Sequence, residues 1–131
     1  MKAMLLLSVV IAFAIPVVAQ VRARDSAWVA PASESERVNP LATRAHLKEG
    51  GEKLYRNRCA TCHAADGIGT TRGPRLVDPD VQAESDGALF WKVSSGNSRA
   101  GMPSFSFLPE LQRWQIVLHL RMLRPTDDGI H

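Results

Sequence analysis

The sequence is poor in cysteine, which limits how the chain can be stabilised. Only Cys59 and Cys62 occur in the 131 residues, and just Ala60 and Thr61 separate them. A disulfide between them would close a very small loop and would restrict the unfolded chain little. We therefore expect no disulfide framework, and the two thiols require another explanation.

The sequence also lacks an excess of charge of one sign. It has 16 Lys and Arg against 13 Asp and Glu, which gives a formal net charge of +3, and only 6% of its residues are aromatic. Proteins that bind nucleic acid usually carry a basic stripe with interleaved aromatic side chains. Because the basic residues here are scattered among acidic ones, we expect no nucleic-acid partner.

Long apolar runs are missing beyond the N-terminus. After the basic Lys2, residues 4–18 are mainly apolar, and small residues lead up to Ala19. This run of roughly 15 residues falls short of the ~20 that a spanning helix needs. We predict a cleaved secretory signal peptide and a periplasmic protein. The alternative is an uncleaved anchor, through which the protein would contact the membrane. If the segment is cleaved, the protein would contact a membrane only through partner complexes.

The rest of the chain fits one small domain with short extensions. The segment after the signal peptide is polar and is broken by Pro31 and Pro40, so we predict a flexible leader, on which Trp28 is either docked or idle. The predicted organisation is a signal peptide at 1–19, a flexible leader at 20–44, a domain at 45–124 and a C-terminal tail at 125–131.

Apolar residues at intervals of three and four predict an all-α domain without strands. The expected helices cover residues 51–62, 87–95 and 109–123, and the Gly- and Pro-rich residues 64–80 form a loop. In the second helix we expect Asp86 as the N-cap and Gly96 at the end. The expected buried side chains of the second and third helices are Leu89, Phe90, Val93, Leu111, Trp114, Val117, Leu118 and Met122.

Residues 59–63 carry the most specific signal, because Cys-Ala-Thr-Cys-His is the C-x-x-C-H arrangement that attaches c-type haem. Thiols three residues apart on a helix share one face, so both can form thioethers with one porphyrin. The adjacent His63 can then bind the iron from the same side. A thioredoxin-like dithiol would need a preceding strand, and a zinc site would need further Cys or His ligands at short spacing. We predict one covalently bound haem c, with its iron.

The second axial ligand is expected to be Met102, which lies in the segment Gly101-Met102-Pro103 between two predicted helices. Glycine permits close backbone approach, proline stiffens the segment, and a thioether ligand favours electron transfer. The chief alternative is His119, and His46 and His131 are weaker ones.

The order of these features over about residues 50–123 resembles the small class I cytochromes c. The resemblance implies three main helices wrapped around one covalently bound haem. It implies contact between the first and last helices, where Gly51, Tyr55 and Trp114 match the family and His119 replaces its usual Tyr or Phe. Ala64 stands where many members have Gly.

The resemblance also implies roles around the haem. The carbonyl of Pro74 would accept a hydrogen bond from His63 and orient its ring. The expected lining of the haem pocket is Leu76, Phe90, Val93, Phe105 and Leu118.

These features predict an electron carrier rather than an enzyme. Its partners would be periplasmic redox proteins, namely a dehydrogenase, a terminal oxidase or another cytochrome, and it would pass single electrons between them. Basic side chains either steer an acidic partner or are merely solvated; they are Arg72, Arg75, Lys92 and Arg99. The alternative is a haem enzyme or gas-sensing subunit with an open distal iron position.

Overall fold

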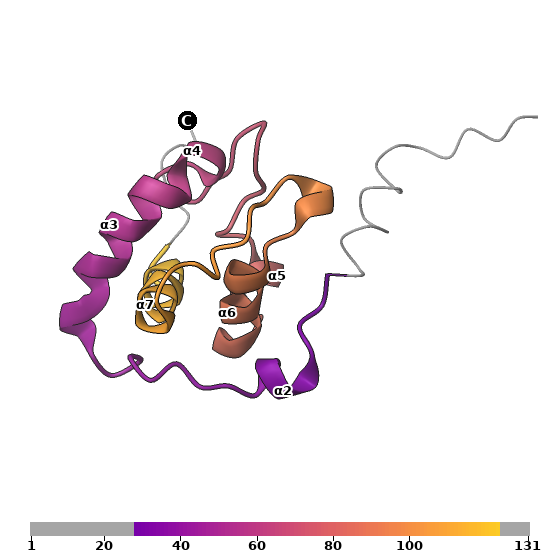
Figure 1. Ribbon diagram of the computed structural model, residues 1–131. Coiled ribbons are helices and arrows are strands. Elements are labelled where there is room, and N and C mark those ends of the chain that lie inside the picture. The colour runs from indigo at the N-terminus through magenta and orange to yellow at the C-terminus, as the bar shows by residue number, and fades with distance from the viewer. Residues whose placement is uncertain (1–27, 124–131) are drawn as a thin grey trace, which may run out of the picture.

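The computed structural model describes residues 28–123, and this part of the chain is helical (Figure 1). In the described residues the only β-type pairs are two isolated bridges, Thr70 with Gly73 and Asn97 with Met102. The elements are α2 (Ala32–Ser35), a 3-10 turn (Ala45–Leu47), α3 (Lys48–Arg58), α4 (Ala60–His63), α5 (Pro79–Gln82), α6 (Asp86–Ser95), a second 3-10 turn (Ser98–Ala100) and α7 (Glu110–Leu120). The predicted all-α fold is confirmed.

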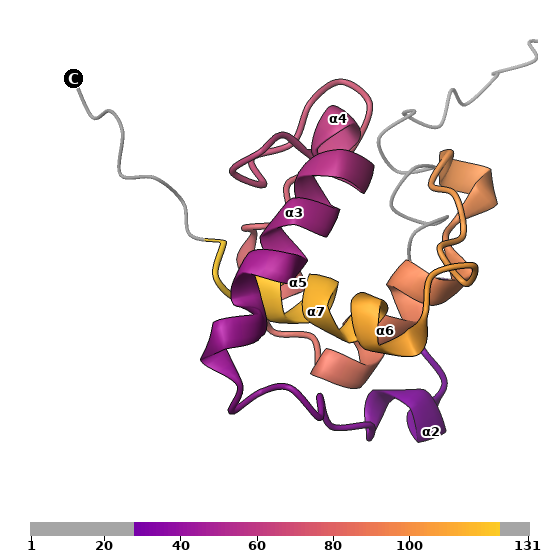
Figure 2. The ribbon, with the colours of Figure 1, turned by 60° about the vertical axis from the view of Figure 1, so that its left-hand side comes forward.

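Helix α3 crosses α7 and forms its most extensive helix contact (Figure 2). The crossing depends on Gly51, because a Cβ there would lie 2.0 Å from the carbonyl oxygen of Gln115. Tyr55 is fully buried beside the crossing, and its ring centroid lies 4.9 Å from that of His119. The predicted first helix is interrupted at Cys59, where φ is −116°, so the signature begins in a turn and continues in α4.

Helix α6 begins one residue earlier than predicted, and its N-cap is Ser85 rather than Asp86. The Ser85 hydroxyl accepts a hydrogen bond from the Ala88 amide, which satisfies a free donor of the first turn. The helix ends at Gly96, whose φ of +64° favours glycine.

Helix α7 occupies the middle of the predicted third helix, with Pro109 as its N-cap. Trp114 and Val117 are buried as predicted, but Leu111 is 53% exposed and Met122 is 49% exposed. The helix ends before Met122, and the following turn leaves that side chain at the surface. The buried positions that the sequence analysis missed are Ile116 and Leu120.

Two apolar clusters form the core. The larger one joins α3, α6 and α7 to the loops on either side of α6. Its buried members are Tyr55, Val77, Val93, Phe105, Leu108, Ile116, Leu120 and Leu123. The smaller one lies where α6 meets α7 and consists of Leu41, Leu89, Phe90, Trp114 and Val117. Trp114 stacks on Phe90 with ring centroids 4.0 Å apart, and the ring of His119 lies beside Tyr55.

The described part of the predicted leader lies against the domain rather than free of it. Leu41 and Asn39 are only 1% and 3% exposed, and Trp28 donates a hydrogen bond to the carbonyl of Gly96 at 2.9 Å. Contacts with residues far along the chain hold this segment against the domain. The polar local sequence did not indicate these contacts.

The predicted signal peptide and C-terminal tail lie outside the described residues. Within residues 28–123, none of the helices has the length and apolar character needed to cross a membrane.

Candidate functional site

The backbone turns through the signature so that both thiols and the histidine leave one short segment. The amides of Cys62 and His63 both donate to the carbonyl of Cys59, at 3.0 Å each. Both cysteines are partly buried, and neither forms a disulfide. The arrangement offers two sulfur atoms and one imidazole within five consecutive residues.

The following loop folds back onto this turn. The Thr70 hydroxyl donates to the carbonyl of Cys62 at 2.6 Å, and the Gly69 amide donates to the carbonyl of His63 at 2.9 Å. A Cβ at Gly73 would lie 2.8 Å from the Cys62 carbonyl oxygen, so the loop can approach this closely only with glycine there. The contacts of Thr70 and Gly69 were not predicted from the sequence; the Gly-Pro pair at residues 73–74 was the one available signal that the loop returns to the histidine.

The loop also sets the orientation of the histidine ring. Nδ1 of His63 lies 2.9 Å from the carbonyl oxygen of Pro74. Because a carbonyl only accepts, Nδ1 carries the proton, and Nε2 keeps a lone pair that can bind a metal. The predicted contact between Pro74 and His63 is therefore present.

Ala64 carries an unusual backbone conformation directly after the histidine. Its φ is +63° and its ψ is 159°, a region occupied almost only by glycine. The Tyr55 hydroxyl donates to the Ala64 carbonyl at 2.8 Å, which holds this peptide in place. The replacement of the usual glycine is therefore a source of strain.

Met102 lies at the base of a tight loop and packs on the same apolar cluster as Cys59. Its amide and carbonyl pair with the carbonyl and amide of Asn97, both at 2.9 Å, and Gly101 takes a left-handed φ of +82°. The fold thus brings Met102 and the thiol turn to one cluster although they are distant in sequence. Leu76, Val93 and Phe105 belong to that cluster, whereas Phe90 and Leu118 belong to the other one.

The alternative histidine ligands are placed differently. His119 lies at the α3–α7 crossing beside Tyr55, and its buried Nε2 has no hydrogen-bond partner. His46 is exposed in the 3-10 turn before α3, and His131 lies outside the described residues.

Cys59 does not have the properties of a reactive thiol, and its surroundings do not form a zinc site. Burial, and secondarily the nearby Cys62, raises the pKa of the Cys59 thiol to about 11, whereas redox dithiols expose a thiolate of lowered pKa. No group of three or more His, Cys, Asp or Glu side chains suited to a metal ion occurs in the described part of the chain. Two sulfurs, an oriented imidazole and an apolar surround instead fit covalent haem.

Comparison with known proteins agrees with this chemistry. Residues 46–120, more than half of the chain, match the family described as "Cytochrome C oxidase, cbb3-type, subunit III". The chain belongs to this cytochrome c family. A c-type cytochrome of this kind carries covalently bound haem c with its iron and takes part in electron transport.

Two solved structures are similar to this cytochrome. The c-type cytochrome KustC0563 is 29% identical with a TM-score of 0.52, and the match covers 56% of this chain and 96% of that one. Cytochrome CL from the marine methylotroph Methylophaga aminisulfidivorans is 22% identical with a TM-score of 0.56, over 65% of this chain and 58% of that one. The second shows the shared fold. No curated protein matches.

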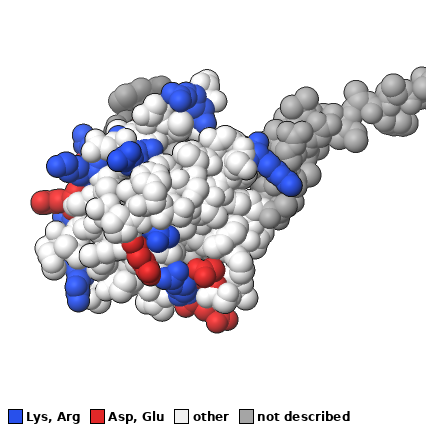
Figure 3. Space-filling model, in the orientation of Figure 1, with Lys and Arg blue, Asp and Glu red and all other residues white. Residues whose placement is uncertain are grey.

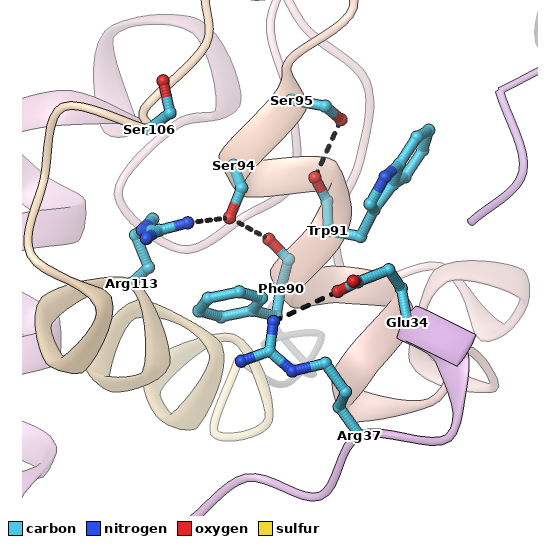
Figure 4. Close-up of a pocket in the computed structure, with 8 residues that line it drawn as sticks. All are labelled: Glu34, Arg37, Phe90, Trp91, Ser94, Ser95, Ser106 and Arg113. Carbon is cyan, nitrogen blue, oxygen red and sulfur yellow. Dashed lines mark hydrogen bonds and ion pairs between the residues drawn. The ribbon is translucent and has the colours of Figure 1, made fainter. Parts of the chain in front are cut away.

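A separate hollow of about 340 Å³ lies between α2, α6 and the start of α7 (Figure 4). Phe90, which was predicted to line the haem pocket, lines this hollow instead, whereas Cys59, Cys62, His63, Pro74 and Met102 do not. The guanidinium groups of Arg37 and Arg113 lie 4.5 and 4.8 Å from the centroid of its Phe90 ring, and Ser94 accepts a hydrogen bond from Arg113. These internal contacts fasten α2 and α7 to α6.

Proposed function

We propose that this cytochrome is an electron carrier in which Cys59 and Cys62 hold haem through thioethers and His63 and Met102 bind its iron. The observation that carries the proposal is the contact between His63 Nδ1 and the Pro74 carbonyl at 2.9 Å, because it fixes the ring and leaves the Nε2 lone pair available to bind iron. The shared apolar cluster of Cys59 and Met102 supports the choice of Met102 as the second ligand.

The residues of the chain have distinct tasks in this account. Bound haem supplies reversible one-electron exchange at its iron. Pro74 fixes the tautomer and orientation of His63, while Leu76, Val93 and Phe105 keep water away from the site. If His63 and Met102 both bind the iron, no position on it would be left open for a substrate, so we infer a carrier and not an enzyme.

We infer that the partners are redox proteins of the periplasm, such as a dehydrogenase, an oxidase or another cytochrome. The description of the matching family names a cytochrome c oxidase, which supports an oxidase as one of them. Figure 3 shows a broad area without Lys, Arg, Asp or Glu across one face, with Lys and Arg side chains above it. Such an area is large enough for the small contacts that transient redox partners make.

The basic side chains differ in how free they are to steer a partner. Lys92 forms an ion pair with Glu84, and Arg75 forms one with Asp78 at 2.9 Å. Arg72 and Arg99 are exposed, and we assign any steering of an acidic partner to them.

Haem attachment can be tested by denaturing electrophoresis and the mass of the intact protein. We expect haem to remain with the chain, because thioethers survive denaturation, and we expect the double variant Cys59→Ala, Cys62→Ala to lose it. Cys59→Ala and Cys62→Ala alone serve as controls and should each retain one thioether. A wild-type protein without covalently bound haem after export from cells able to mature cytochromes would contradict the proposal.

A further inference from the structure

The N-terminal strap, residues 28–41, runs along α6 on the outside of the domain (Figures 1 and 2). Its short helix α2 touches α6 backbone to backbone, since a Cβ at Gly87 would lie 2.0 Å from the carbonyl oxygen of Glu34. In Figure 4 the Arg37 guanidinium lies against the Phe90 ring, 4.5 Å from its centroid. The strap therefore has a fixed position relative to α6.

One end of the strap is anchored in the core. The Asn39 side chain is buried and donates to the carbonyl of Trp114 at 3.2 Å, while its oxygen accepts from the Leu41 amide at 2.9 Å. This anchor lies on α7.

The other end of the strap reaches the C-terminus of α6. The indole NH of Trp28 donates to the carbonyl of Gly96 at 2.9 Å. The ammonium of Lys92 lies 4.8 Å from the centre of the Trp28 ring and is itself held by an ion pair with Glu84. Trp28 thus has both a polar and a cation–π contact at this point.

The carbonyl that Trp28 binds belongs to the base of the Met102 loop. Gly96 takes a φ of +64° and lies so close to Pro103 that a Cβ would be 2.5 Å from the Pro103 carbonyl carbon. The next residue, Asn97, makes both backbone hydrogen bonds to Met102, at 2.9 Å each. The Gly96 carbonyl that Trp28 binds and the Asn97 amide that donates to Met102 therefore belong to one peptide group.

We infer that Trp28 is a positioning residue that holds the Met102 loop in place for the iron. The inference rests on the proposed function, in which Met102 is the second axial ligand. Without the indole NH, the Gly96 peptide loses one hydrogen bond that restrains the loop, and the methionine sulfur yields more readily to an external ligand.

The test is an imidazole titration of the mature ferric protein, followed by loss of the sulfur-to-iron absorption band. Trp28→Phe keeps an aromatic ring but removes the NH, and we expect imidazole to bind about three- to tenfold more tightly, the effect of one lost hydrogen bond. Trp91→Phe is the matched control, because it changes a tryptophan on α6 that lies in the hollow of Figure 4. Its imidazole affinity should equal that of the wild type.

Asn39→Ala separates positioning of the loop from general stability. It loosens the anchored end of the strap, so we expect a lower unfolding temperature by circular dichroism with unchanged imidazole affinity. The inference is overturned if Trp28→Phe binds imidazole like Trp91→Phe, or if Asn39→Ala raises the affinity as much as Trp28→Phe. A wild-type protein that lacks the sulfur-to-iron band would instead overturn ligation by Met102, and this inference with it.

Discussion

The residue after the proposed haem-binding histidine carries local strain. Ala64 has φ +63° and ψ 159°, a conformation that costs a non-glycine residue about 1–3 kcal/mol. We expect Ala64→Gly to raise the free energy of unfolding by about 1 kcal/mol, because relief of this strain outweighs the greater freedom of glycine in the unfolded chain. Denaturant unfolding followed by circular dichroism measures this change.

Ala65→Gly is the control for that comparison, because Ala65 is exposed and its φ is not positive. We expect it to lower the free energy of unfolding by about 0.5 kcal/mol through the unfolded chain alone. If Ala64→Gly were equally destabilising, the strain at Ala64 would be refuted.

His119 makes stability depend on pH. Burial lowers its pKa; Glu52 opposes this shift, Arg56 adds to it, and Nε2 has no partner. In the unfolded chain His119 takes up a proton near pH 6.5, whereas in the folded protein it takes up a proton only at lower pH. The free energy of unfolding should therefore be at its full value above that pH and fall as the pH decreases below it.

The measurement compares denaturation midpoints at about pH 7.5 and about pH 5.5, on either side of the ordinary histidine value. In His119→Phe, which keeps a ring against Tyr55, we expect a smaller decrease between the two values. His46→Phe alters an exposed histidine and should behave like the wild type. An equal decrease in all three proteins would rule out His119 as the source.

At the scale of elements, the two adjacent glycines of α3 differ in whether their positions can accept a larger side chain. A Cβ at Gly51 would lie 2.0 Å from the Gln115 backbone oxygen, so Gly51→Ala must push α3 and α7 apart. We expect a loss of about 3 kcal/mol in the free energy of unfolding, measured with denaturant.

Gly50→Ala is the matched control in the same helix. Its Cβ would meet the amide end of the Gln115 side chain at 2.7 Å, which can rotate away. Alanine also favours the helix by about 1 kcal/mol, so the net change should be within about 1 kcal/mol of zero. A Gly51→Ala protein as stable as Gly50→Ala would contradict the close crossing.

The presence of the helices was predicted correctly from the sequence. The residues at which they end, and the side chains that they bury, were predicted less well. Periodicity located α6 and α7, but it placed Leu111 and Met122 inside and missed Ile116. Burial on α7 is decided by two neighbours at once, α3 and α6, which a single apolar stripe does not encode. The aromatic rings of α7 show both neighbours, because His119 lies beside Tyr55 of α3 and Trp114 stacks on Phe90 of α6.

For the whole molecule, local chemistry was predictable and long-range contact was not. The thiol turn and His63 form one short motif, so their proximity follows from the sequence. The contact between His63 and Pro74 was expected only through family resemblance, and the polar strap gave no sign of its packing. Asn39 and Trp28 are held by residues 75 and 68 positions away, which no local pattern reports.

The most direct test of the account is the visible and near-infrared absorption spectrum of the purified ferric protein. We expect a low-spin spectrum with the weak sulfur-to-iron band, abolished in Met102→Ala and retained in Met122→Ala, whose side chain is 49% exposed. A high-spin wild-type spectrum, or a band that survives in Met102→Ala and disappears in Met122→Ala, would contradict it.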